Sequence, residues 1–407
     1  MNVDDIDLAD PALFTTSRAI EVFATLRRKS PVHRYEAPDG GTGFWVVSRY
    51  DDVVSVLRTP EIFSSEYGNI LPTRARRDPT AGVMTFTTDP PVHRRLRSMM
   101  TPGLTPRAVE TIKPMVGRII NQIVSEVAVG EPFDFMEKIA GDLPIAVSCG
   151  LLGVPESDWQ YLIGQIHISH GVKDENLVVP TSSRKGYSTA NLTLLGYFMD
   201  LVAARRKEPA DDLVSVMAKG RPDGESLTDE EIAVNCFAMT LGGFQADRNA
   251  MGGGVLALME HPDQFEHLVR DRSIMPTAVE EILRWSTPTL NLARVALTST
   301  EIAGVPIAEG DHVSAWLYSA NRDETVFDNP HEFDLTRQPN RHLSFGSSTH
   351  YCVGANVARL EMTTLLSAIL DRGLVPEKAG EPTPIASYFQ QGLKHLPVQF
   401  ERRAVAP

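Results

Sequence analysis

Cys352 is the residue best suited to metal chemistry, because it follows a loop rich in glycine and serine and stands where a helical pattern begins. Unpaired backbone N–H groups and the positive dipole end at a helix start stabilise a thiolate and temper the electrons it donates to a metal. A small buried structural cysteine would fit the same place. Cys149 and Cys236 form no CxxC or Cys/His zinc pattern with it, so at most one cysteine is expected to carry chemistry.

Two further pairs of residues carry charge at helical spacing. Glu281 and Arg284 lie three residues apart and therefore on one face of a helix, where such a pair is most often a surface salt bridge worth less than about 1 kcal/mol. His93 and Arg97 lie one turn apart and could hold two carboxylates of a ligand through charge-assisted hydrogen bonds. For either pair alone, charges on a solvated surface are the alternative interpretation.

The elements that must position these residues are mainly helical, with minor β structure. Thr228 and Glu231 form a capping-box start for a helix that continues to about Met259, before His261 and Pro262 end it. About thirty residues of helix span about 45 Å, enough to cross a domain. Other helical patterns occur near residues 20–28, 53–57, 109–149, 192–218, 275–285 and 352–370, and strand-like runs near residues 43–48, 294–297, 300–303, 312–316 and 396–400.

The composition is that of an ordinary globular protein, with 42% hydrophobic and 22% charged residues among 407. No linker, repeat or low-complexity run divides the chain, so we expect a single domain over residues 1–407, with residues 1–15 loosely ordered. No segment is apolar long enough to span a bilayer, which predicts a soluble cytoplasmic protein without membrane association. The net charge of −13 argues against nucleic-acid binding.

Residues 345–354, which read FGSSTHYCVG, resemble the ligand loop of the cytochrome P450 family, F-x-x-G-x-x-x-C-x-G. Phe345, Cys352 and Gly354 match this pattern. Ser348 stands where the family usually has glycine, so we expect a different or slightly strained backbone there. The Glu281 segment precedes Cys352 in the family's order, and counterparts of bacterial members extend over residues 23–400.

The resemblance implies the cytochrome P450 fold, with a long central helix crossing the haem and a small sheet on the N-terminal side. It implies a monooxygenase with haem b, in which Cys352 is the axial thiolate ligand and Phe345 shields the sulfur from water. Glu281 and Arg284 would then form a buried ion pair that supports the fold. The other implied cofactor contacts are Gly354 in the loop and His93, Arg97, Arg294 and His342 at the propionates.

The long helix departs from the family's usual A-G-x-[D/E]-T, an acid and alcohol pair that delivers protons to bound dioxygen. The corresponding residues 242–246 read GGFQA, so neither an ionisable group nor a hydroxyl occupies its usual place. The catalytic candidates in this helix are Gly243, Gln245, Ala246 and Asp247.

Three explanations of this departure compete. A substrate group with water held by Gln245 could replace the pair, Asp247 or a rearranged helix could supply protons, or the chemistry could be oxidative coupling, desaturation or a peroxide-driven reaction. The first and third are preferred, because Asp247 lies one residue further on and is turned about 100° around the helix axis. Gln245 and Ala246 could also be neutral changes.

Substrate contacts are implied by the resemblance in loops and in the long helix. They predict a mid-sized, partly polar natural product, such as a secondary metabolite. The apolar candidates are Phe86, Phe244, Leu290, Leu292 and Phe389, and the neutral polar ones are Asn69, Asn291 and Tyr388.

The partners implied are a ferredoxin and its NAD(P)H-dependent ferredoxin reductase, since the chain carries no reductase domain. Arg94, Arg95 and Arg359 are candidates for the contact with an acidic ferredoxin, and we expect the protein to be a monomer. The alternative from another functional class is a haem protein that binds a small ligand without turnover.

Overall fold

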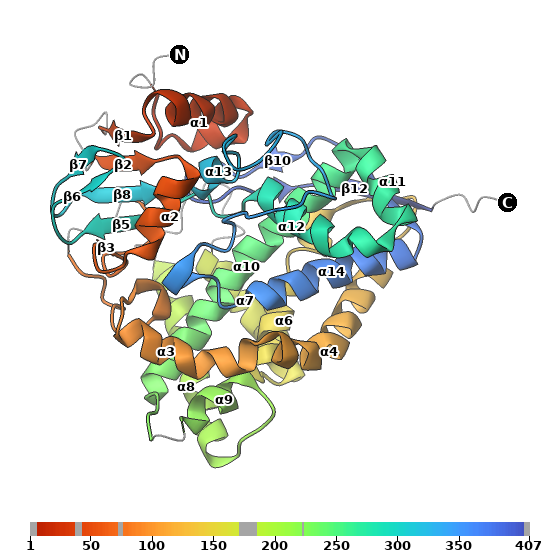
Figure 1. The fold of residues 1–407 in the computed structure, drawn as a ribbon. Coiled ribbons are helices and arrows are strands. Elements are labelled where there is room, and N and C mark those ends of the chain that lie inside the picture. The colour runs from red at the N-terminus through yellow and green to blue at the C-terminus, as the bar shows by residue number, and fades with distance from the viewer. Residues whose placement is uncertain (1–5, 37–42, 72–75, 171–184, 222–223, 403–407) are drawn as a thin grey trace.

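The computed structural model describes residues 6–36, 43–71, 76–170, 185–221 and 224–402. Helices make up most of this part of the chain and pack beside a smaller sheet region, so the predicted mainly α fold with minor β is confirmed (Figure 1). Across the described ranges, no helix combines the length and the apolar character needed to span a bilayer. The α-helices are α1 (Arg18–Lys29), α2 (Tyr50–Arg58), α3 (Val92–Met100), α4 (Pro106–Ser125), α5 (Phe135–Lys138), α6 (Leu143–Leu152), α7 (Trp159–His170), α8 (Lys185–Lys207), α9 (Leu213–Lys219), α10 (Asp229–Glu260), α11 (Pro262–Arg270), α12 (Met275–Ser286), α13 (Leu317–Ala320) and α14 (Ala355–Asp371), and the 3-10 helices are η2 (Pro11–Thr15), η3 (Thr85–Thr87), η4 (Thr101–Leu104), η5 (Glu156–Asp158), η6 (Arg272–Ile274) and η7 (Ser348–His350).

The main sheet has the strand order β1-β2-β8-β5-β3, in which β2 and β8 are parallel and the other neighbours antiparallel. Strands from both halves of the chain therefore share one sheet. This pairing fixes β5, which carries Arg294, beside β8. The strands are β1 (Val32–Tyr35), β2 (Phe44–Val47), β3 (Phe63–Ser64), β4 (Pro132–Asp134), β5 (Leu292–Ala296), β6 (Thr300–Ile302), β7 (Val305–Ile307), β8 (His312–Ala315), β9 (Leu374–Lys378), β10 (Thr383–Pro384), β11 (Leu393–His395) and β12 (Pro397–Arg402).

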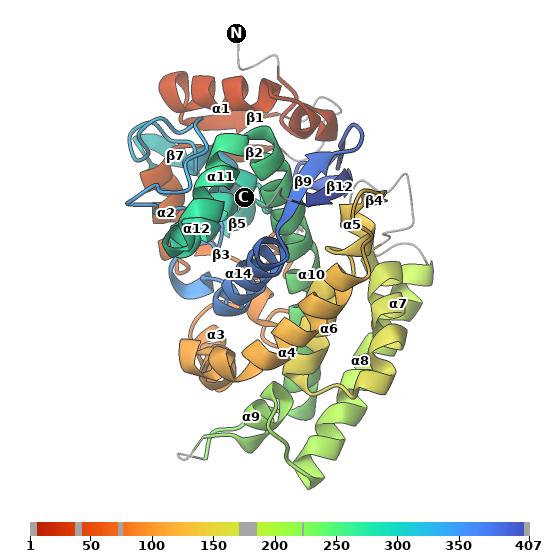
Figure 2. The ribbon, with the colours of Figure 1, turned by 90° about the vertical axis from the view of Figure 1, so that its right-hand side faces the viewer.

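The longest described helix, α10, runs through the middle of the helical region in both views (Figures 1 and 2). Its capping box is complete, because the Glu231 N–H donates to the Thr228 hydroxyl and the Thr228 N–H donates to the Glu231 carboxylate. It ends at Glu260, before His261, as the sequence predicts. Packing against α6, α8 and α12 buries it on several sides.

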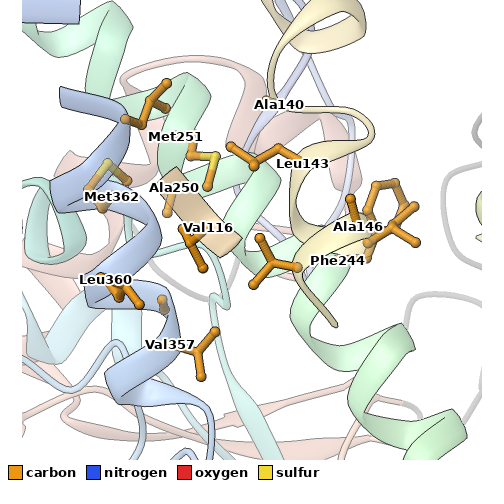
Figure 3. Packing of buried hydrophobic residues seen from close by; sticks show 14 of the residues in the cluster. Val116, Ala140, Leu143, Ala146, Phe244, Ala250, Met251, Val357, Leu360 and Met362 are labelled. Atoms are coloured by element: carbon orange, nitrogen blue, oxygen red, sulfur yellow. The ribbon is translucent and has the colours of Figure 1, made fainter. Parts of the chain in front are cut away.

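The main hydrophobic core joins α4, α6, α10 and α14. Figure 3 shows Val116 of α4 and Leu143 of α6 close to Met251 of α10 and Met362 of α14. Because these side chains are almost fully buried, they hold the helices at fixed positions and so define the walls of the site described below.

The segment before α1 is packed, which corrects the expectation that residues 1–15 are loosely ordered; residues 1–5 lie outside the described part. Leu8 and Phe14 are buried, and the Phe14 ring stacks on Trp316 with 5.5 Å between the ring centroids. Burial of these apolar side chains offsets the entropy lost in ordering the segment.

Candidate active site

Cys352 lies at the end of a tight loop that leads into α14. The Cys352 N–H donates to the Phe345 carbonyl at 2.8 Å, and a Cβ added to Gly354 would meet the Cys352 sulfur at 3.9 Å. Ser348 has a φ of 58°, in the left-handed region where an L-residue is strained. The loop holds the sulfur at the wall of an internal cavity.

This cavity lies between α10 and α14 and reaches α3, β5 and the loop before α14. Much of its wall is apolar, with Met100, Leu283 and Val357 among the lining residues. Cys352 is exposed and lines the cavity, so a ligand in the cavity can reach its sulfur.

Desolvation makes the free thiol of Cys352 a weak acid. Burial raises its pKa to about 11 and the Asp247 carboxyl acts in the same direction, whereas the Gly354 backbone and Arg97 only partly oppose them. A cation beside a thiol can reverse this balance, and a coordinating metal deprotonates a thiol outright. The sulfur is therefore placed to become a thiolate when it binds a metal ion.

Four basic side chains meet at one edge of the cavity: His93 and Arg97 from α3, Arg294 from β5 and His350 from η7. Burial and Arg97 lower the pKa of His93 to about 4, and burial lowers that of Arg294 to about 10. Within the described residues, His93 Nδ1 is buried without a hydrogen-bond partner. Donors crowded together in this way favour an anionic ligand, and two carboxylates would satisfy them.

His342 does not belong to this group, which corrects its predicted role as a propionate contact. Its Nε2 lies 3.1 Å from Glu280 Oε2, and it is not among the described residues that line the cavity. Glu280 also accepts two hydrogen bonds from Arg359, at 2.6 and 2.8 Å, and this carboxylate holds His342 away from the cavity. The missed residue is His350, and its position two residues before Cys352 is the signal that could have identified it.

Phe345 contacts both this ionic cluster and the Cys352 loop, because its ring lies 5.9 Å from the His342 ring and its carbonyl accepts from the Cys352 N–H. Its ring borders the cavity, and the Arg359 guanidinium lies 4.6 Å from the ring centroid. The ring therefore lies beside the Cys352 loop, and its role as a shield of the sulfur stays a prediction.

Glu281 and Arg284 are both fully buried and joined by two hydrogen bonds of 2.8 Å. Arg337, which the sequence did not single out, adds a second guanidinium at 3.1 Å from Glu281 Oε2. Arg284 also donates to the carbonyls of Asn321 and Pro330. The network therefore fastens α12 to the long loop before Cys352, a structural role.

The face of α10 that borders the cavity carries Gly243, Ala246 and Asp247. Gln245 is not among the described residues that line it, so the expectation that Gln245 holds water beside a substrate is not supported. The reason is helical geometry: Ala246 and Asp247 follow Gly243 by three and four residues and therefore project on its side of the helix, whereas Gln245 follows Gly243 by two residues and is turned by about 200° from it. Asp247, the alternative that the sequence disfavoured, is the ionisable residue of α10 among the described residues that line the cavity.

Only part of the predicted substrate set borders the cavity. Phe244 and Leu290 are fully buried in hydrophobic clusters, and Asn291 donates to the Tyr388 carbonyl. These residues face away because packing in the core decides which side of an element is exposed to the cavity, and periodicity does not encode it. Of the predicted set, Asn69, Phe86 and Leu292 line the cavity, and Phe244, Leu290, Asn291, Tyr388 and Phe389 are not among its described lining residues.

A flat apolar cofactor with two carboxylates and a metal that takes a sulfur ligand fits this donor set. The orphaned His93 Nδ1 and the neighbouring basic groups suit the carboxylates, the apolar walls suit a macrocycle, and Cys352 suits the iron. Fold and site together define a haem-thiolate protein, whose cofactor is haem b.

The chain belongs to the cytochrome P450 family. The family model described as Cytochrome P450 matches residues 176–387. A cytochrome P450 numbered 126 from Mycobacterium tuberculosis is 38% identical over 97% of both chains, and the steroid C26-monooxygenase of Rhodococcus jostii is 32% identical over 98% of this chain and 85% of the relative. The crystal structure of P450 OxyD, involved in the biosynthesis of vancomycin-type antibiotics, matches with a TM-score of 0.87 and 32% identity, covering 98% of this chain and all of OxyD. The protein is accordingly a cytochrome P450 monooxygenase.

Proposed function

We propose that this monooxygenase oxidises a mid-sized, partly polar organic substrate, such as a secondary metabolite. The observation that carries the proposal is the continuity of one cavity from Cys352 to a mixed lining of apolar and neutral polar side chains. Phe86 and Leu292 offer apolar contact, and Asn69 and Thr289 offer neutral hydrogen bonds. The involvement of OxyD in antibiotic biosynthesis supports a product of secondary metabolism, whereas the steroid C26-monooxygenase supports a lipid-like skeleton.

Haem iron activates dioxygen when it is bound, and the chain's own residues must hold the substrate and supply protons. Ala246 has no hydroxyl, and Gln245 does not face the cavity. Asp247 does face it, so Asp247 takes the role of proton donor to the cavity, with substrate groups or water completing the path. Oxidative coupling, desaturation and peroxide-driven chemistry on the same haem are the alternative, and of these only the peroxide-driven reaction dispenses with proton delivery to dioxygen.

Electrons come from a separate ferredoxin and its NAD(P)H-dependent reductase under this proposal. Of the three candidate contacts, Arg95 forms an ion pair with Glu231 and Arg359 forms one with Glu280. Arg94 is exposed on α3, the helix that carries His93 and Arg97 to the cavity. Arg94 is therefore the contact best able to offer its charge to an acidic partner.

The test is a Soret titration of the haem-loaded protein with two compound sets, followed by turnover with NADH, ferredoxin and reductase. One set contains steroids and terpenoids, and the other contains aromatic and cyclic-peptide metabolites. We expect a low-to-high-spin shift from the second set, with NADH consumption and an oxidised product. A shift confined to the first set would replace the secondary metabolite by an aliphatic skeleton. Spin shifts without any product from either set would favour the non-catalytic ligand-binding alternative.

A further inference from the structure

Glu361 is a buried carboxyl that none of the roles above uses. It lies on α14, is 1% exposed, and borders the same cavity as Cys352 together with Val357 and Ala358. Within the described residues its Oε2 atom is buried without a hydrogen-bond partner. An ionised carboxylate in such a place is costly, so the group needs a proton or a partner.

The other carboxyl among the described residues that line this cavity is that of Asp247. Glu361 and Asp247 project from α14 and α10, which pack against each other, and both line the cavity. Figure 3 shows the two helices at this level, with Ala250 on α10 and Val357 and Leu360 on α14.

Two like charges in one desolvated space cannot both persist. Burial raises the pKa of both carboxyls well above their usual range, and Asp247 raises that of Glu361 further. From α4, α10, α12 and β9, the elements packed on α14, no described basic side chain lowers either pKa. Arg359, two residues before Glu361, binds Glu280 on the other side of α14. Carboxyls arranged in this way titrate as one unit and keep a proton at a pH where a lone carboxyl would lose it.

We propose that Glu361 and Asp247 form a carboxyl pair that holds one proton in common and delivers it to the cavity, taking over the task of the missing acid and alcohol. Glu361 is thus a positioning and proton-storing residue that acts through Asp247. The inference rests on the proposed monooxygenase reaction, in which RH + O2 + 2 e− + 2 H+ gives ROH + H2O with electrons from the ferredoxin. The pair releases a proton to cavity water at Asp247 and regains one from water, so its own proton count is restored after each transfer.

The first test reads the pair directly, without turnover. Infrared difference spectra of the ferric holoprotein, recorded against pH in H2O and D2O, report the C=O band of protonated carboxyls. Glu361→Gln and Asp247→Asn should each remove band intensity at pH 7 and shift the titration of the remaining carboxyl to lower pH, because the like charge is gone. Asp371→Asn, at the exposed end of α14, is the matched control and should change nothing. An unshifted titration in both single variants would overturn the pair.

The second test measures how reducing equivalents are used. Glu361→Gln should lower product formed per NADH by about tenfold or more, with the loss appearing as peroxide, while the substrate-induced Soret shift stays as in wild type. Glu361→Asp, which retains a titratable carboxyl, should recover part of the product formed per NADH. A merely structural role of Glu361 would not predict this recovery. If Glu361→Gln does not fold, the same measurements of product per NADH and of the Soret shift are made on Asp247→Asn, which changes the carboxyl on α10.

The two proposals fail in different ways. A wild type that oxidises no compound in either set would sink the proposed reaction, and the infrared titration would still decide whether the carboxyls are coupled. A wild type that turns over, with Glu361→Gln equally well coupled and its carboxyl band unchanged, would overturn the pair and leave the reaction intact.

Discussion

The imidazole rings of His93 and His350 lie 4.3 Å apart, centroid to centroid, at an angle of 50°. One ring comes from α3 and the other from η7, so the contact joins the first half of the chain to the loop that carries Cys352. Burial and the positive charge of Arg294 hold the pKa of His350 well below its usual range, and its Nε2 lies 3.1 Å from the Ser65 hydroxyl. The pair is thus set as neutral hydrogen-bonding groups beside Arg97 and Arg294, where the haem propionates are expected.

Replacing His350 should therefore loosen the cofactor, whereas replacing His342 should not. His350→Leu removes one hydrogen-bonding group from a charged ligand, which is worth about 1.5–3 kcal/mol, so haem loss should accelerate by about tenfold or more. His342→Leu is the matched control, because His342 contacts Glu280. The measurement is the rate of haem transfer to excess apomyoglobin. Faster loss from the His342 variant than from the His350 variant would contradict the assignment.

Ser348→Gly should stabilise the protein. The φ of 58° at Ser348 costs an L-residue about 1–2 kcal/mol, and glycine removes that strain at the expense of a more flexible unfolded chain. A net gain of about 0.5–1 kcal/mol is expected, read as a higher melting temperature of the holoprotein. Ser347→Gly provides the control, since its φ of −148° is extended backbone, and glycine there should lower the melting temperature. Equal shifts in both variants would show that strain at Ser348 is not the cause.

The partly buried Glu280–Arg359 ion pair predicts a pH-dependent stability. Burial acts to raise the pKa of Glu280, but hydrogen bonds from Arg359 and His342 outweigh it and lower the pKa to about 2. Because the pKa of Glu280 is lower in the folded than in the unfolded protein, the contribution of this ion pair to the free energy of unfolding is complete above about pH 4.5. The contribution is lost as the pH falls towards 2. The shift in pKa corresponds to at most about 3 kcal/mol.

Glu280→Gln should accordingly lower the melting temperature at pH 7, with a difference from wild type that shrinks between pH 5 and pH 3. The control is Glu260→Gln, which breaks an ion pair of similar length, 2.7 Å to Lys378, whose side chains are both more than 40% exposed. An exposed pair contributes less than about 1 kcal/mol, so this variant should differ little at any pH. If the melting temperatures of wild type and the Glu280→Gln variant differ by the same amount at pH 7 and pH 3, the ionisation of Glu280 is not the cause of the pH dependence.

Elements with strong local signals could be predicted from the sequence. The α10 helix was predicted because Thr228 and Glu231 form its capping box and His261 and Pro262 end it, and the Cys352 loop because its residues are specified by one short segment. The side of a helix or loop that faces a cavity could not be predicted, since tertiary packing decides it. His342 and His350 flank the same loop, but only His350 faces the cavity. Glu361 was missed because an acidic residue in a helical pattern indicates solvent exposure unless the opposing element is known.

The last prediction concerns electron entry. Arg94→Glu should slow reduction of the haem by ferredoxin by about tenfold at low ionic strength, and the difference from wild type should fade as salt screens the exposed charge. Arg270→Glu is the matched control, because Arg270 is exposed on α11, which lies far from α3 in both views (Figures 1 and 2). It makes the same change in net charge and should leave the rate close to that of wild type. If the two variants slow reduction equally, overall charge and not a contact on α3 governs the encounter, and ferredoxin docks elsewhere.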